Sequence, residues 1–336
     1  MHSRVAGDLE RIGSGMKRGA RLTLAPARGE GPFTLASTPN PRHTAPMKDM
    51  DAFGASLLTG FMLILGLNQV VIALTNQGLQ PVFAAGIRSV GSGLLIWGWM
   101  LARGIPVRFD RHAGPGLAVG AIFTAEFVFL FVALDLTTVA RTSILFYSMP
   151  VWLAAMTHFV LPGDAMTRTK AAGLVLAFAG SALAILVRGT EGRASLVGDL
   201  CAVGAAIAWA GMAVTVRATK LREESAEMQL LWQLAISAPA LLLLAFLFGP
   251  FIRDFEPWHA AGMLFQIVCV SGFGFLLWLW LLSIYAPSAV ASFSFLTPVF
   301  GVGLGWWLLD EPVGWALVLA LAMVAGGLVL VNRPAR

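Results

Sequence analysis

Charged side chains are scarce in this sequence. Asp, Glu, Lys and Arg make up 12% of the 336 residues, whereas an average soluble domain contains about 25%. Hydrophobic residues make up 57%, and the mean hydropathy is +0.78. So few polar side chains cannot cover a water-facing surface, which excludes a soluble enzyme, a disordered protein and a nucleic-acid binder. The composition indicates an integral membrane protein with many spans in the lipid bilayer.

Motifs for nucleotide, metal or covalent chemistry are missing too. The sequence contains no GxxxxGK[ST] phosphate-binding loop, no GxSxG and no HExxH. Cys201 and Cys269 lie in separate apolar runs, and the five histidines show no paired ligand spacing. We therefore expect no metal, no cofactor, no catalytic residue and no partner nucleic acid. We predict that the protein is not an enzyme.

The alternation of polar and apolar residues that a membrane β-barrel needs is absent. The apolar residues form runs that approach 20 residues, the length of a helix that crosses about 30 Å of hydrocarbon. Because backbone polar groups must be satisfied within the bilayer, we predict an all-α membrane protein. Its ten predicted transmembrane helices cover residues 53–75, 80–102, 114–134, 138–161, 171–187, 198–217, 228–249, 259–282, 287–309 and 314–332.

Residues 1–50 are basic and rich in Arg, Gly, Pro, Ser and Thr, without an apolar run. A signal peptide needs an apolar stretch of about 7–15 residues, so none is assigned to this segment. We expect a disordered N-terminal tail. The alternative is that translation starts at Met47, immediately before the first predicted helix.

Lys and Arg are concentrated in alternate loops between the predicted helices. Arg103, Arg108, Arg111, Arg168, Lys170, Arg217, Lys220, Arg222, Arg333 and Arg336 fall on one side, and only Arg141, Arg188, Arg193 and Arg253 on the other. Basic loops stay in the cytoplasm. We therefore predict a multi-pass protein of the plasma (inner) membrane with both termini cytoplasmic.

The sequence also contains an internal repeat. Pro150 corresponds to Pro298 at an offset of 148 residues, and Gly180 corresponds to Gly327 at an offset of 147. Residues 53–187 and 198–332 would each hold five helices. Because five is odd, the second copy enters the membrane inverted relative to the first. Inverted repeats around a central site are typical of secondary transporters.

Each predicted repeat has a proline in its fourth helix, then a short acidic loop and a fifth helix that contains glycine. The matching residues are Pro150, Gly163, Asp164, Gly173 and Gly180 in the first repeat, and Pro298, Asp310, Glu311, Pro312, Gly326 and Gly327 in the second. The second repeat opens with GDLCAVGAAIAWAGMAVTVR from Gly198. With these features the chain resembles an EamA-type member of the drug/metabolite transporter superfamily, although its first acidic loop has Asp164 rather than Glu. The resemblance implies two inverted five-helix EamA-like repeats and transport of a small organic solute.

Two charged residues, Arg88 and Glu126, lie inside predicted helices. A charged side chain at membrane depth costs about 2.5–3.5 kcal/mol on insertion scales, so it is expected to pair or to face a wet cavity. One interpretation is an Arg88–Glu126 ion pair that joins two helices, and the other is a substrate or proton site. A third is a misplaced helix boundary that lets one charge reach the interface.

Further candidates are polar or aromatic residues within the predicted helices. Pro150 and Pro298 remove a backbone donor and are expected to kink their helices, next to hydroxyl groups that could line a cavity. The alternative interpretation of these residues is packing and hydrogen bonding between helices. The remaining substrate or coupling-ion candidates are Asn68, Tyr147, Ser148, Trp209, Gln233, Gln266, Ser294 and Thr297.

Taken together, these patterns predict a secondary active transporter that exports a small organic metabolite or drug by alternating access, coupled to protons. A homodimer is left open. One alternative is a membrane-embedded lipid-modifying enzyme, which needs clustered carboxylates or histidines at the interface, where only Asp135, Asp164 and Glu256 are scattered. The other is a membrane scaffold that transports nothing and has no solvent-filled cavity.

Overall fold

The computed structural model describes residues 50–160, 167–187, 195–285, 290 and 293–331. In these ranges the chain is helical apart from its loops and one isolated bridge between Leu79 and Ile252. Eight helices or helix pairs are long and apolar enough to cross a membrane, and two shorter apolar helices follow them. The prediction of ten transmembrane helices is confirmed, whereas the N-terminal tail and the alternative start at Met47 lie outside the described residues.

The first half contributes six helical segments and the second half contributes the others. In the first half these are α2 (Ala52–Gly78), α3 (Pro81–Ala102), α4 (Ala113–Leu136), α5 (Val139–Phe146), α6 (Met149–Val160) and α7 (Arg168–Leu186). In the second half they are α8 (Leu196–Ala218), η2 (Lys220–Glu223), α9 (Ala226–Leu244), η3 (Ala245–Leu247), α10 (Pro257–Leu264), η4 (Phe265–Gly274), α11 (Phe275–Ile284), η5 (Phe293–Phe295), α13 (Leu296–Leu309) and α14 (Trp315–Val331).

Helix boundaries follow local capping chemistry. Asp51 accepts a hydrogen bond from the Gly54 N–H at the start of α2, and Gln80 precedes Pro81 at the first position of α3. Ser195 and Ser225 cap α8 and α9 in the same way. Such side chains satisfy backbone donors that have no partner within the helix.

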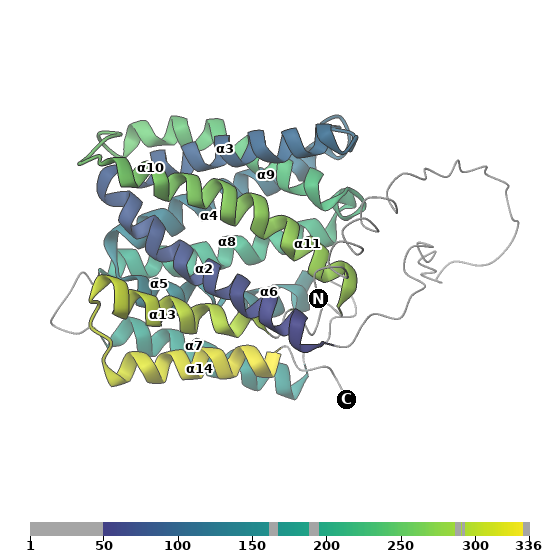
Figure 1. Ribbon diagram of the computed structural model, residues 1–336. Coiled ribbons are helices and arrows are strands. Elements are labelled where there is room, and N and C mark those ends of the chain that lie inside the picture. Colours follow the sequence, from purple (N-terminus) through teal and green to yellow (C-terminus); the bar gives the residue numbers. More distant parts are fainter. Residues whose placement is uncertain (1–49, 161–166, 188–194, 286–289, 291–292, 332–336) are drawn as a thin grey trace, which may run out of the picture. The chain divides into compact units, whose positions relative to one another are not determined.

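The helical bundle has two ends. We call the end where α2 begins and α14 finishes the proximal end, and the opposite end the distal end. The distal end includes the loops that join α2 to α3, α4 to α5, η3 to α10 and α13 to α14. In Figure 1, α3 and α9 run together along one edge of the bundle, and α7 and α14 run together along the opposite edge.

The packing of α7 on α14 shows the inverted relation of the two halves. A Cβ placed on Gly173 would lie 2.8 Å from the Gly327 carbonyl oxygen, and one on Gly180 would lie 2.9 Å from that of Ala320. The offset of 147 residues relates Gly173 to Ala320 and Gly180 to Gly327, so exchange of the halves converts one contact into the other. Small residues here let the two backbones approach closely.

The spans that contain the two repeat-related prolines, Pro150 and Pro298, change their helix type or break before the proline. In the first half, α5 ends at Phe146 and α6 begins at Met149, one residue before Pro150. In the second half, the 3-10 helix η5 leads into α13, which begins two residues before Pro298. Proline has no N–H and crowds the carbonyl four residues earlier, which accounts for the change in helix type.

Candidate functional site

A cavity of about 320 Å³ lies in the middle of the bundle, and we call it the central cavity. Both halves contribute to it. Its lining residues are Phe61, Leu65, Asn68, Arg88, Phe123, Glu126, Phe127, Leu130, Phe146, Tyr147, Met149, Trp209, Leu230, Leu234, Val270, Ser271, Phe275 and Trp278. The wall is therefore largely apolar and aromatic, with a few polar groups of the kind that orient a bound molecule.

Arg88 enters the central cavity from α3, seven residues after the helix begins at Pro81. Its guanidinium carbon lies 4.9 Å from the centre of the Phe127 ring and 6.0 Å from that of Phe131. An aromatic face attracts a cation, and the attraction grows when water is excluded. The side chain is buried, and its Nε has no hydrogen-bond partner. Arg88 is therefore held by aromatic rings and retains a donor for another group.

Glu126 enters the same cavity from α4, ten residues before that helix ends at Leu136. It is 4% exposed, and its Oε2 has no hydrogen-bond partner. The ion pairs between described residues do not join Glu126 to Arg88. The direct ion pair, one of the three interpretations of the sequence, is therefore not formed, and both groups line one cavity with unused hydrogen-bonding capacity.

Three of the other candidates also line the central cavity. Asn68 comes from α2 and its buried Oδ1 has no hydrogen-bond partner, whereas Tyr147 stands at the break between α5 and α6. Trp209 is half-buried on α8. The neighbouring Gln69, by contrast, is not part of the lining and accepts a hydrogen bond from the Ser143 hydroxyl. The site therefore combines polar groups of the first half with aromatic residues from both halves.

The remaining predicted residues do not line the central cavity. The Ser148 hydroxyl donates to the Leu145 carbonyl, which satisfies it locally. Gln266 donates to Thr75, and the Thr297 hydroxyl contacts the sulfur of Met62. Gln233 on α9, Ser294 on η5 and the kink residues Pro150 and Pro298 also lie outside the lining.

The sequence analysis missed part of the wall that the second half supplies. Residues Phe265–Gly274 form a π-helix in the middle of the span that joins α10 to α11. Val270 and Ser271 of this segment line the cavity, and Phe275 follows directly. π-Helical turns occur often at functional sites because they change the direction in which side chains point.

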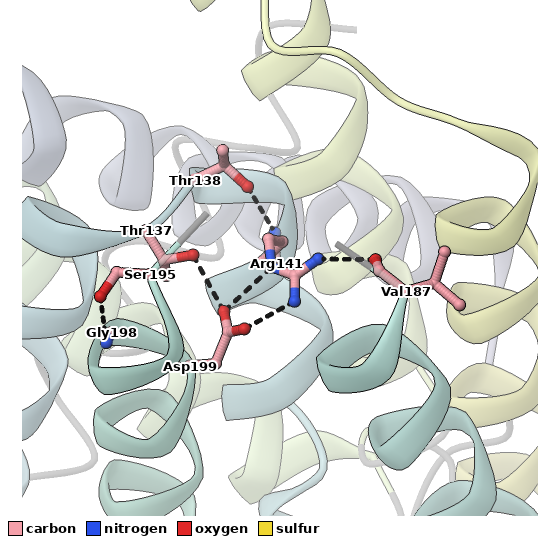
Figure 2. A network of polar contacts seen from close by, with 7 residues as sticks. All are labelled: Thr137, Thr138, Arg141, Val187, Ser195, Gly198 and Asp199. Atoms are coloured by element: carbon pink, nitrogen blue, oxygen red, sulfur yellow. Dashed lines mark hydrogen bonds and ion pairs between the residues drawn. The ribbon is translucent and has the colours of Figure 1, made fainter. Parts of the chain in front are cut away.

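The distal end is joined by a buried ion pair between the two halves (Figure 2). Arg141 of α5 donates from Nε to Oδ1 of Asp199 at 3.0 Å, and from a terminal nitrogen to Oδ2 at 2.6 Å. The Thr137 hydroxyl also donates to Asp199, and Arg141 donates to the Val187 carbonyl. Arg141 was counted with the loop charges although the predicted helix 138–161 contains it. In the structure it is a buried residue of α5, and its Nε and both terminal nitrogens donate hydrogen bonds.

Glu311 makes a second connection at the distal end. Its carboxylate accepts hydrogen bonds from the backbone N–H groups of Val139 at 2.6 Å and Ala140 at 2.8 Å, at the start of α5. Burial raises the pKa of the Glu311 carboxyl, and these two donors act in the opposite direction. The corresponding acid of the first half, Asp164, lies outside the described residues.

Arg253 makes a third connection. Its guanidinium binds both carboxylate oxygens of Asp135, at 2.6 and 3.0 Å, and also donates to the Asn76 carbonyl. The loop before α10 thereby holds the distal ends of α2 and α4. The distal end of the bundle is thus closed by contacts that link one half to the other.

A ten-helix membrane bundle of two inverted halves, with a central cavity closed at one end, is the architecture of a membrane transporter. The chain belongs to the EamA-like transporter family, which matches residues 52–186 and 196–333.

Individual relatives agree with this assignment. The uncharacterized transporter YvbV of Bacillus subtilis is 29% identical over 296 residues, which cover 86% of this chain and 95% of that protein. An uncharacterized transporter of Archaeoglobus fulgidus is 27% identical over 280 residues, covering 80% and 94%. One solved crystal structure matches 82% of this chain and 97% of its own with a TM-score of 0.60 and 21% identity, which supports the fold alone.

Proposed function

We propose that this transporter exports a small organic solute across the plasma membrane in exchange for protons. The observation that carries the proposal is a pair of oppositely charged residues in one aromatic cavity, Arg88 with an unpartnered Nε and Glu126 with an unpartnered Oε2. A buried charge without a partner is costly. A bound solute that presents a group of each sign, or a proton on Glu126, would offset this cost.

The lining favours a solute with an apolar or aromatic body. Trp209, Trp278 and Phe275 provide faces for stacking, whereas Glu126 offers the carboxylate and Arg88 the guanidinium. The solute is therefore a compact molecule with an apolar part, a positive group for Glu126 and an oxygen acceptor for Arg88. The cavity volume of about 320 Å³ lies at the lower end of the range for small-molecule sites.

Exchange follows from competition at Glu126. A carboxylate can hold a proton or a positively charged group of the solute, so binding of one favours release of the other. A proton gradient directed into the cell would then drive the solute outward. The contacts at the distal end would break in the alternate conformation, which opens the cavity to the outside if both termini are cytoplasmic.

Flux into proteoliposomes with and without a pH gradient, across a panel of candidate solutes, tests this proposal. We expect Glu126→Gln to abolish pH-driven flux, because the amide cannot exchange a proton. Gln233→Ala is the matched control, since Gln233 lies within a span but outside the cavity, and it should leave flux near the wild-type level. A Glu126→Gln protein that folds and transports normally would exclude Glu126 from the mechanism.

The two alternative functions make different predictions. A scaffold predicts no central cavity, and the structure contains one. A lipid-modifying enzyme needs clustered carboxylates or histidines at the interface. Asp135 and Glu256 do come together at the distal end, but the Asp135 carboxylate is occupied by Arg253. Membership of a transporter family favours transport over both alternatives.

A further inference from the structure

A second cavity, of about 430 Å³, opens at the distal end, and we call it the distal vestibule. It lies between the end of α2, the end of α4 and the loop before α10. Its lining residues are Ala73, Asn76, Gln77, Leu134, Asp135, Arg253, Asp254, Glu256, Trp258 and His259. In contrast to the central cavity, most of these side chains are polar.

The distal vestibule has a negative balance of charge. Its one guanidinium, that of Arg253, is bound to both oxygens of Asp135, so these two charges compensate each other. Asp254 and Glu256 add two further carboxylates. A recess lined with carboxylates concentrates cations and repels anions.

Asn76 gives an independent indication of a ligand. This side chain is 1% exposed, and its Nδ2 donates to the Phe131 carbonyl at 2.9 Å. Its Oδ1 is buried without a hydrogen-bond partner, although the residue lines the vestibule. A buried acceptor without a partner costs about 1–3 kcal/mol, and a ligand that donates a hydrogen bond would remove this cost.

His259 adds a donor to the same lining. Its Nδ1 accepts a hydrogen bond from the Glu256 N–H at 2.8 Å, which in the neutral ring places the hydrogen on Nε2. That Nε2 is also buried without a partner. The vestibule therefore presents acceptors for a positive group and one donor for an oxygen atom, as Glu126 and Arg88 do in the central cavity.

The vestibule and the central cavity lie along the same two helices. On α2, Asn68 lines the central cavity and Asn76 lines the vestibule, and their spacing of eight residues corresponds to about 12 Å. On α4, Leu130 and Leu134 do the same one turn apart. The Asn76–Phe131 hydrogen bond joins the two helices between the cavities. If α2 separated from α4 at the Asn76–Phe131 hydrogen bond, the two cavities would be connected.

We propose that the distal vestibule is a second binding site on the transport path, which receives the ammonium group of the solute after it leaves Glu126. This inference rests on the proposed function. The exit route then runs between α2 and α4, and Asn76 acts at both stages. Its Nδ2 first donates to the Phe131 carbonyl and closes the route, and its Oδ1 then accepts a hydrogen bond from the solute.

The experiment measures labelling of an introduced cysteine by thiol reagents of opposite charge. In a background of Cys201→Ser and Cys269→Ser, Gln77→Cys places an exposed thiol in the vestibule, and Phe248→Cys places one at the distal end outside it. Detergent-purified protein is treated with an ammonium-bearing and a sulfonate-bearing methanethiosulfonate. We expect the ammonium reagent to be favoured about tenfold more at Gln77→Cys than at Phe248→Cys, as two nearby carboxylates would produce.

Adding Asp254→Asn and Glu256→Gln to Gln77→Cys should lower the ratio of the two labelling rates toward that of Phe248→Cys. Equal ratios at the two positions before this change would overturn the proposal. Ala73→Cys, also in the vestibule, gives a second measurement if Gln77→Cys does not fold. The labelling does not depend on transport. Labelling without charge selectivity, together with intact Glu126-dependent flux, would reject only the vestibule proposal. Selective labelling without flux would reject only the proposed transport.

Discussion

The two ends of the bundle are joined differently. At the distal end, Arg141 and Asp199 form an ion pair with side chains that are 5% and 0% exposed, at 2.6 Å. At the proximal end, the ion pair between His112 and Glu224 spans 3.8 Å with side chains that are 21% and 14% exposed, and it is charged only when His112 is protonated. Of these two ion pairs between described residues, the distal one is the shorter and the more deeply buried.

The repeat sharpens this comparison because it places equivalent residues at the two ends. The offset of 148 residues relates Asp51 to Asp199 and Thr137 to Tyr285. Each aspartate accepts a hydrogen bond from its hydroxyl partner: Thr137 donates to Asp199, and Tyr285 donates to Asp51. In the sequence, the equivalent of Arg141 is Ala289, which has no charge. The two related aspartates thus each have a hydroxyl partner, and Asp199 also binds the guanidinium of Arg141.

Removal of one member of the distal ion pair should have the largest effect. We expect Arg141→Ala to lower the free energy of unfolding by about 3–5 kcal/mol, because Asp199 is left as a buried charge without its partner. Thermal unfolding in detergent measures this change. The double variant Arg141→Met with Asp199→Leu should recover most of the loss, and a double variant as unstable as the single one would contradict this explanation.

Loss of the Glu311 carboxylate should have a smaller effect that depends on pH. Burial raises the pKa of the Glu311 carboxyl in the folded state, so the folded chain binds the carboxyl proton more tightly than the unfolded chain does. This contribution to stability is fully present below the unfolded pKa and is lost as the pH rises through the folded pKa. The difference in free energy of unfolding between the wild type and Glu311→Gln should therefore fall as the pH rises from the unfolded pKa through the folded pKa of Glu311. Unfolding measured at several pH values tests this. A difference that rises with pH would mean that the hydrogen bonds from Val139 and Ala140 dominate.

The proximal ion pair should matter least. His112→Asn should change the free energy of unfolding by less than about 0.5 kcal/mol, since partly exposed pairs contribute little. Asparagine is the suitable replacement because His112 has a φ of 54°, a left-handed conformation that asparagine tolerates. A loss as large as that of Arg141→Ala, measured by the same unfolding assay, would remove the distinction between the ends.

The ten helices could be predicted because burial in lipid leaves a strong signal, namely long apolar runs between short polar breaks. The depth of Arg88 and Glu126 could be predicted for the same reason. Hydropathy reports depth but not which way a side chain faces around the helix. Gln266 and Thr297 were therefore candidates by depth, yet they contact neighbouring helices instead of the cavity.

Other features had no signal of their own in the sequence. The π-helix at Phe265–Gly274 is a change in hydrogen-bond register that no residue pattern marked. Arg141 was counted with the loop charges although the predicted helix 138–161 contains it, and its partner Asp199 lies 58 residues further on. Such pairings depend on how the two halves pack, which the repeat alone does not specify.

The contact between α7 and α14 has a mechanical consequence. The Gly173–Gly327 and Gly180–Ala320 contacts are equivalent under the repeat. The packing of α7 on α14 would therefore stay the same if the two halves exchanged their conformations, as is required of a contact about which the halves rotate. In the alternating access proposed above, α7 and α14 would keep their contact while the opposite edge of the bundle moves, so a bulky side chain at Gly173 should block the movement in both directions.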